Sequence, residues 1–460
     1  MTGRLVELPA GEVRGERDGV VVRFPGIRYA TAEPYGMPSA WIGPEAAARQ
    51  VGTEAAARQP GPETTTLQVE HPPASPQTSS VMLETLLGGF PEHIGQDPQC
   101  QYLSVTAPES ARPGERLPVM VWIHGGGNAN SNPEFSVYDP RWLVEEQRVV
   151  VVKPTYRLGY LGFGGHRADH LPNLGAMDLL EALRWVQAHI GAFGGDPENV
   201  TLFGQSSGGD MALSLMGTPS ADGLFRRVIA QSPPLGIRGM SARLRAKVTA
   251  KLDAEAAAHA APTLIEYQQA IEKAAWLYGS GFMPFGIQWD AAPFAGPGTK
   301  RAKILTGARG RDVLIGTNDA ESGMYLPAIP GIKSIYDDPR WARWVRLLLV
   351  RPTTYGIFSG ASRRLSRALR SAAASSAYYR FSWTPTPATA AIHMAELPLL
   401  FGGPDNETWR GSPLLPVSDE AEVARAGAAG EELRRIWGRF ARSGRIEAGP
   451  ALDDGFFVER

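Results

Sequence analysis

Residues 204–209 constrain this chain more than any other stretch of its sequence. They read Gly-Gln-Ser-Ser-Gly-Gly and follow the apolar segment 200–203, which is typical of a buried β-strand. A serine flanked by glycines at the end of a strand indicates a nucleophile elbow, a sharp strand-to-helix turn that lifts the hydroxyl above the sheet. We therefore predict that Ser206 is a nucleophile. Because this pattern is short enough to arise by chance, the rest of the sequence has to support it.

A second glycine-rich loop supports this interpretation. The apolar run 119–123 ends in His124, Gly125, Gly126 and Gly127. Such a loop brings backbone N–H groups close to a reacting carbonyl, because no Cβ stands in the way. We predict that the N–H groups of Gly126 and Gly127, with that of Ser207 after the nucleophile, form an oxyanion hole.

Together these motifs resemble those of type-B carboxylesterases. This family includes bacterial p-nitrobenzyl and aryl-carbamate esterases, animal carboxylesterases and cholinesterases. The resemblance is dense from about 115 to 235 and patchy elsewhere. It implies an α/β-hydrolase fold, with a mostly parallel central sheet flanked by helices, in a single catalytic domain spanning residues 1–460. It also implies helical insertions over an active-site gorge, at about 235–305 and 335–375.

The resemblance also points to the other members of a catalytic triad. Glu321 takes the place of the family's triad glutamate after a strand, and Asp319 is the alternative. In the fold's chain order the serine comes first, then the acid, then the histidine. Of the eight histidines, His393 is the one that follows both, within a segment that resembles the family's H-x-x-E-L-P motif. Glu396 in that segment either braces the loop or closes the gorge entrance.

Three positions, compared with the family pattern, bear on which substrate the enzyme would accept. Gln205 stands where most family members have glutamate, which predicts weaker attraction of cations and therefore neutral, small to medium esters rather than choline esters. Asn128 opens a polar stretch, 128–132, that either hydrogen-bonds the substrate or forms a solvated loop. Phe285 and the nearby Trp289 resemble the family segment that lines the acyl pocket.

Composition narrows the partners. The formal net charge is −1, so no global field indicates nucleic acid or an anionic membrane. No N-terminal apolar h-region and no stretch of about 18 apolar residues is present, so we expect neither a signal peptide nor a transmembrane helix. Cys100 is the single cysteine, which excludes an intrachain disulfide and suits the cytoplasm. We expect a small-molecule ester as partner, no cofactor and no metal; monomer and homodimer both remain open.

Apolar patterning predicts alternating strands and helices, as in a doubly wound sheet. A hairpin turn is expected at 18–19, a long surface loop at 52–98 and a closing amphipathic helix around Trp437. Helices are expected at 178–190, 241–279 and 339–376. Strands are expected at 101–106, 118–123, 148–153, 199–204, 227–231, 311–316 and 377–382.

The sequence therefore predicts a carboxylesterase-type serine hydrolase that works through Ser206, Glu321 and His393. A carbamate or amide hydrolase with the same triad is an alternative, because attack on an ester and on an amide needs the same groups. A non-catalytic, cholinesterase-like binding protein is the alternative from a different class. Such proteins typically lose a triad residue, whereas all three are present in this chain.

Overall fold

The computed structural model describes most of the chain. The described residues are 3–43, 67–78, 80, 85–87, 90–91, 93–165, 170–237, 242–256, 263–277, 283–326, 329, 331–336, 339–385, 390–403, 412–447, 452 and 455–459.

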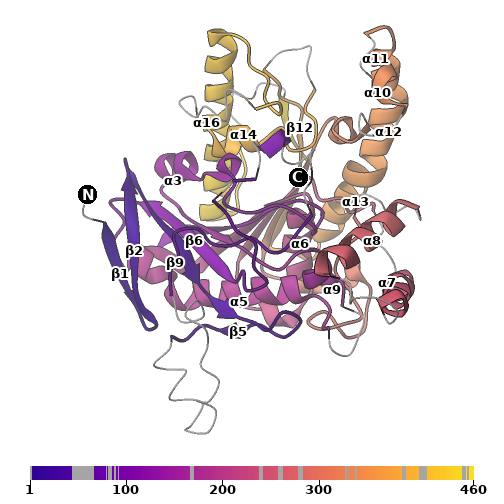
Figure 1. The fold of residues 1–460 in the computed structure, drawn as a ribbon. Coiled ribbons are helices and arrows are strands. Elements are labelled where there is room, and N and C mark those ends of the chain that lie inside the picture. The colour runs from indigo at the N-terminus through magenta and orange to yellow at the C-terminus, as the bar shows by residue number, and fades with distance from the viewer. Residues whose placement is uncertain are drawn as a thin grey trace.

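One mixed sheet of eleven strands runs through these residues (Figure 1). From β8 to β12 the neighbouring strands are parallel, whereas β1, β2, β3 and β6 at one edge and β13 at the other pair antiparallel. In sheet order the strands are β1 (Arg4–Leu8), β2 (Gly11–Asp18), β3 (Val21–Arg28), β6 (Tyr102–Pro108), β8 (Val150–Pro154), β7 (Leu117–Ile123), β9 (Gly195–Gln205), β10 (Arg227–Gln231), β11 (Asp312–Asn318), β12 (Ser375–Phe381) and β13 (Phe456–Glu459).

The predicted α/β architecture is confirmed. Each of the seven predicted strands is present, with ends shifted by a few residues, and the hairpin between β2 and β3 turns at the predicted place. The central strands β7 and β8 are buried along their whole length, which explains the apolar sequence of β7 and the three valines that begin β8. The edge strand β13 was not predicted, because its short segment near the C-terminus shows no clear alternation.

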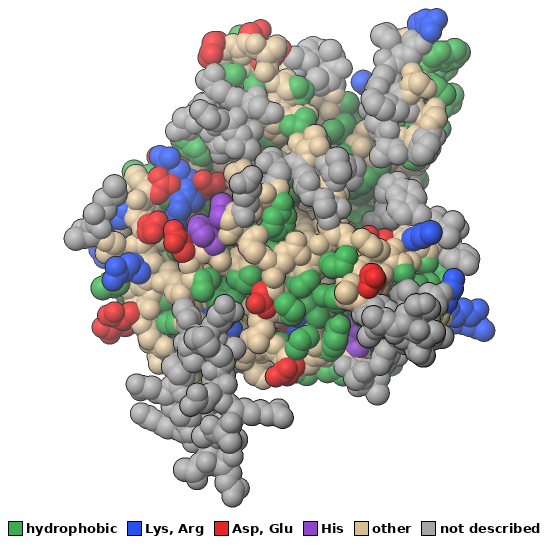
Figure 2. Space-filling view, viewed as in Figure 1, with side chains coloured by type: hydrophobic (Ala, Val, Ile, Leu, Met, Phe, Trp, Pro, Cys, Tyr) green, Lys and Arg blue, Asp and Glu red, His purple; other side chains and the backbone are tan. Residues whose placement is uncertain are grey.

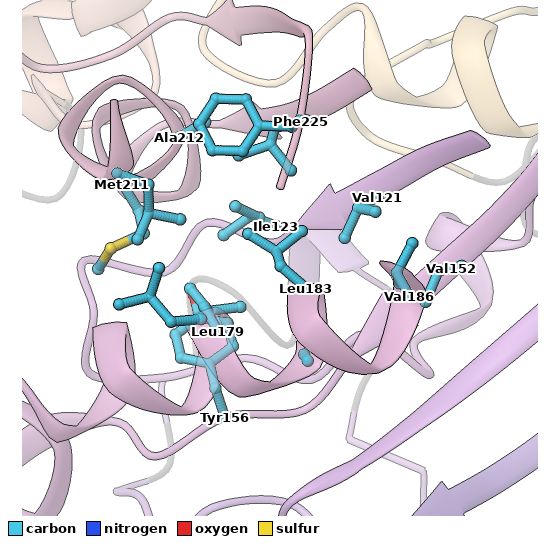
Figure 3. Close-up of a cluster of buried hydrophobic side chains, with 14 of the residues drawn as sticks. Val121, Ile123, Val152, Tyr156, Leu179, Leu183, Val186, Met211, Ala212 and Phe225 are labelled. Carbon is cyan, nitrogen blue, oxygen red and sulfur yellow. The ribbon is translucent and has the colours of Figure 1, made fainter. Parts of the chain in front are cut away.

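Helices cover both faces of the sheet and bury two separate cores. On one face α5 (Leu174–His189) and α6 (Ser207–Leu215) pack on β7 and β8, where Leu183 and Val186 meet Val121 and Val152 (Figure 3). Helix α5 begins at Leu174 rather than at residue 178 as predicted. The same face carries α4 (Gly159–Phe163), α8 (Leu264–Leu277), α9 (Lys300–Gly307) and α13 (Gly360–Leu369).

The opposite face is closed by the C-terminal helix. Helix α16 (Glu420–Ser443) buries Leu433, Ile436, Trp437 and Phe440, as the predicted closing helix should. Asp419 caps its first turn by accepting from the Glu422 N–H at 2.8 Å. Beside it lie α3 (Arg141–Gln147) and α14 (Leu397–Phe401), which complete this core.

Helices also occupy both stretches in which the sequence predicted helical insertions. The first holds α7 (Ala242–Ala256), α8 and α9; the second holds α10 (Lys333–Tyr336), α11 (Pro339–Val345), α12 (Arg351–Thr354) and α13. Two π-helical turns, Arg346–Val350 and Tyr355–Ser359, interrupt the second group. In Figure 1 this group projects from the body of the molecule.

The surface loop predicted at 52–98 is wrong in part. Residues 52–66 lie outside the described chain, but Ala74, Ser75 and Gln77 are buried. The Ser75 hydroxyl accepts a hydrogen bond from the Leu158 N–H at 2.9 Å, so this stretch is part of the packed interior.

Charged side chains of both signs are scattered over the face in Figure 2. Among the described helices, none combines the length and the apolar character needed to cross a bilayer.

Candidate active site

Ser206 stands alone between a strand and a helix. It follows the last residue of β9 and precedes the first residue of α6, with φ 57° and ψ −125°. Non-glycine residues rarely adopt a positive φ, and such strain is typical of a nucleophile elbow. The flanking glycines permit close packing, since a Cβ on Gly208 would lie 2.0 Å from the Ile123 carbonyl oxygen. The turn therefore pushes the serine side chain out of the sheet.

The loop after β7 packs directly against this turn. A Cβ on Gly125 would lie 3.1 Å from Ser206 Cβ, so the glycine permits the contact. Gly126 and Gly127 have φ values of 111° and 66°, which favour glycine. No hydrogen bond between described residues uses their N–H groups. Ser207 is the first residue of α6, where backbone N–H groups lack helical partners. The three residues predicted to supply the oxyanion donors thus lie around Ser206.

Glu321 and His393 meet in the interior. Glu321 Oε2 lies 2.5 Å from His393 Nδ1, and both side chains are at most 1% exposed. The other carboxylate oxygen accepts from the Asn318 N–H at 2.7 Å, which holds the acid in place at the end of β11. This pairing puts the proton of the neutral imidazole on Nδ1 and leaves Nε2 as an acceptor. A neutral imidazole in this tautomer can accept a proton at Nε2.

Asp319 lies elsewhere. Its side chain is 45% exposed and its carboxylate lies 3.9 Å from Arg380, so the structure pairs His393 with Glu321 and not with this alternative. Glu396 is fully buried and accepts from Asn318 Nδ2 at 2.6 Å and from Gln231 Nε2 at 3.1 Å. Burial, together with the nearby Glu321, raises its pKa. Of the two roles considered for Glu396, the structure favours bracing of the loop.

Two further side chains contact Ser206 and His393. Gln205 Nε2 lies 3.0 Å from His393 Nε2, so the amide donates to the nitrogen expected to take the serine proton. The Tyr325 hydroxyl hydrogen-bonds the Ser206 side chain, and its ring lies 5.4 Å from the His393 ring. Burial raises the pKa of Tyr325, so its hydroxyl stays neutral. Tyr325 was not predicted, because nothing in its local sequence sets it apart from a core aromatic residue.

A cavity of about 450 Å³ opens above these groups. Gly126, Gly127, Ser206 and His393 all line it, together with Gln205 and Tyr325. The second π-helical turn contributes Ile357 and Phe358 to the cavity wall. Such turns are frequent at functional sites. The remaining wall is largely apolar and includes Met283, Pro284, Met324, Leu326 and Ile329.

Three of the predicted substrate-binding residues lie outside this lining. Phe285 is fully buried in the core, and Trp289 packs 5.0 Å from the Phe294 ring. Asn128 is buried and donates from Nδ2 to the Phe285 carbonyl at 3.3 Å, so the expectation of a solvated loop is wrong. The loop turns inward to support the segment that carries Pro284, and Ala129 and Asn130 face the cavity instead. Gln205 remains the predicted substrate-site residue that reaches the cavity.

Comparisons with known proteins show which family the chain belongs to. The model of the carboxylesterase family matches residues 2–336. The chain belongs to this family. A probable N-octanoylanthranilate hydrolase of Rhodococcus erythropolis is 32% identical over 450 residues, which cover 96% of this carboxylesterase and 93% of the relative. The para-nitrobenzyl esterase of Bacillus subtilis is 44% identical over 143 residues, or 30% of this chain and 28% of the relative.

Solved structures show the same fold. A thermophilic p-nitrobenzyl esterase superposes with a TM-score of 0.76 at 23% identity, covering 99% of this chain and 97% of the other. A carboxylesterase of Geobacillus stearothermophilus superposes with a TM-score of 0.71 at 25% identity and the same coverage. This carboxylesterase therefore has the α/β-hydrolase fold and is a hydrolase. The hypothesis of a non-catalytic binding protein is accordingly abandoned.

His124, at the start of the glycine loop, makes the stability of the carboxylesterase sensitive to acid. Its ring stacks on Tyr156, and Nδ1 lies 2.8 Å from the Gly125 carbonyl oxygen. Complete burial lowers its pKa to about 4. Because an unfolded histidine titrates near 6.5, the unfolded state takes up the proton first as the pH falls. The contribution of His124 to the free energy of unfolding is therefore at its maximum above about pH 6.5 and declines toward pH 4.

We expect the free energy of unfolding to fall by about 2 kcal/mol, through the titration of His124, when the pH is lowered from 7 to 5. Urea unfolding at the two pH values measures this change. The variant His124→Asn, which keeps a donor near the Nδ1 position but cannot become charged, should lose correspondingly less. Equal losses in the variant and the wild type would show that His124 does not titrate as described.

Proposed function

We propose that this carboxylesterase hydrolyses neutral, small to medium carboxylic esters through a Ser206–Glu321–His393 triad and an acyl-enzyme. The observation that carries the proposal is the 2.5 Å pair of His393 Nδ1 and the buried Glu321, with His393 lining one cavity together with the strained Ser206. A base oriented by an acid next to a nucleophile is the arrangement that acyl transfer requires.

In the proposed reaction His393 Nε2 takes the proton of Ser206 as its oxygen attacks the carbonyl carbon. Glu321 stabilises the imidazolium that results. The N–H groups of Gly126, Gly127 and Ser207 stabilise the oxyanion. The imidazolium then protonates the leaving group, and water attacks the acyl-enzyme by the same route, with Nε2 as base.

Gln205 and Tyr325 set the starting point of this cycle. In the resting arrangement the Gln205 amide occupies His393 Nε2, and Ser206 is paired with Tyr325. Ser206 must therefore take the place of the amide at Nε2 before it can lose its proton. All four groups line the same cavity.

A carbamate or amide hydrolase with the same triad is the second candidate. It is favoured by the Rhodococcus relative, whose name describes an octanoyl group on the nitrogen of anthranilate. An amide leaves as an amine and needs the same proton from His393. The candidates differ only in the substrate that the cavity accepts best.

A substrate panel separates the two candidates. We expect kcat/KM for p-nitrophenyl butyrate to exceed that for butyrylcholine by about tenfold or more, because Gln205 leaves no carboxylate beside the nucleophile to pair with a quaternary ammonium. Phenyl carbamate and butyranilide complete the panel. Faster turnover of the anilide than of the ester would assign amide hydrolysis, and a preference for choline would contradict the proposed substrate class.

A further inference from the structure

Polar side chains in the cavity wall form one connected cluster. Asn130 Nδ2 lies 3.2 Å from Thr78 Oγ1, and Thr78 Oγ1 lies 3.3 Å from Glu272 Oε1. Asn130, Thr78 and Glu272 all line the cavity. From behind, Gln268 on α8 donates to Glu272 Oε1 at 3.0 Å and lies 3.4 Å from the Ala129 carbonyl oxygen. The cluster thus joins α8 to the loop that carries the proposed oxyanion donors.

Glu272 brings a carboxyl group into this cavity, without an ionic partner among the described residues that line it. Among the lining residues that the structure describes it is the one carboxyl group, and none of them is lysine or arginine. Both of its hydrogen bonds with described residues end on Oε1, so Oε2 accepts none from them. Burial raises the pKa of Glu272, while the two donors on Oε1 favour its ionised form. The geometry therefore places in the wall a carboxyl group whose Oε1 is held by two donors and whose Oε2 accepts no hydrogen bond from the described residues.

We propose that Glu272 selects substrates by charge: it binds an N–H or ammonium group of the substrate through Oε2 and rejects substrates that carry a carboxylate. This inference rests on the proposed ester hydrolysis and extends its substrate class from neutral esters to esters that carry an N–H donor. A choline group has no N–H and cannot donate to Oε2. Gln205 removes a carboxylate beside the nucleophile, but Glu272 supplies one farther along the wall. A substrate with a carboxylate next to the scissile bond, as in N-acylanthranilates, meets a like charge in a poorly solvated cavity.

Three butyrate esters of matched size test this selection at pH 8: 4-acetylphenyl, 4-carboxyphenyl and 4-(aminomethyl)phenyl butyrate. The wild type and Glu272→Gln are compared on all three. Glutamine keeps the shape and an oxygen for Gln268 and Thr78 but removes the charge. Each charged ester is measured as a ratio of kcat/KM to the neutral acetyl ester in the same enzyme, which cancels any general change in activity.

We expect Glu272→Gln to raise the ratio for the carboxyl ester about tenfold and to lower the ratio for the aminomethyl ester by a similar factor. The control variant Glu431→Gln removes the same charge from an exposed position on α16 and should leave both ratios unchanged. If Glu272→Gln changes all three esters by one common factor, Glu272 only supports the loop and the proposal is wrong.

A measurement on the wild type does not depend on the variant folding. Benzylamine should inhibit hydrolysis of the neutral ester at lower concentration than benzoate, and the reverse order would overturn the proposal. Failure of the wild type to hydrolyse the neutral ester at all would instead contradict the proposed esterase function, so the two failures are distinguishable.

Discussion

Replacing Ser206 with alanine is expected to lower kcat for p-nitrophenyl butyrate by roughly 10⁶-fold, because loss of the nucleophile in such triads leaves only binding and oxyanion stabilisation. In the proposed mechanism the hydroxyl is the reacting group, and the backbone N–H groups of Gly126, Gly127 and Ser207 cannot replace it. Initial rates with enough enzyme to detect the uncatalysed background measure the loss.

Thermal unfolding provides the control for this variant. Alanine meets the same positive φ of 57° as serine, so the strain of the turn is retained. The melting temperature of Ser206→Ala should stay close to that of the wild type. A folded variant that keeps a tenth of the wild-type activity would show that another residue attacks the substrate.

Replacing Glu321 with glutamine is expected to lower kcat by about 10⁴-fold, the effect known when a triad acid becomes an amide. The amide no longer favours the proton on His393 Nδ1, so Nε2 is less available as a base, and the imidazolium loses its counter-charge. The 2.5 Å contact and its burial make this effect large. Steady-state kinetics at pH 8 measure it.

Asp319→Asn is the matched control for Glu321→Gln. Both changes convert a carboxylate into an amide, two residues apart, but Asp319 is half-exposed and faces Arg380. Its replacement should change kcat by less than about twofold, because an exposed ion pair contributes little. The opposite ranking of the two variants would transfer the role of the acid to Asp319.

Local patterns predicted the parts of the molecule that depend on local geometry. Gly204 and Gly208 predict the strand-to-helix turn, because each packs so closely against backbone that a side chain with a Cβ would not fit. The run of valines that begins β8 predicts a strand buried on both faces. Chain order then selected His393 from eight histidines, and the structure brings it to Glu321. These features are readable because one short segment carries each of them.

Features that depend on distant segments were not predictable in this way. Phe285 lies in the core, and its backbone carbonyl accepts a hydrogen bond from Asn128, 157 positions away in the sequence. The sequence around Glu272 is that of a polar, solvated helix. Only the structure shows that the Thr78 hydroxyl, 194 positions away, donates a hydrogen bond to its carboxylate. Tyr325 and Gln205 reach Ser206 and His393 only after the turn has folded. Such contacts leave no periodic trace in the sequence.

Covalent labelling with a fluorophosphonate tests the central claim most directly, since this reagent captures a serine activated by a neighbouring base. Intact mass should show one label per chain, and peptide mapping should place it on Ser206. Glu321→Gln should slow the labelling, and Ser206→Ala should abolish it. A label on another residue, or ester hydrolysis that continues after Ser206 is fully labelled, would contradict the account.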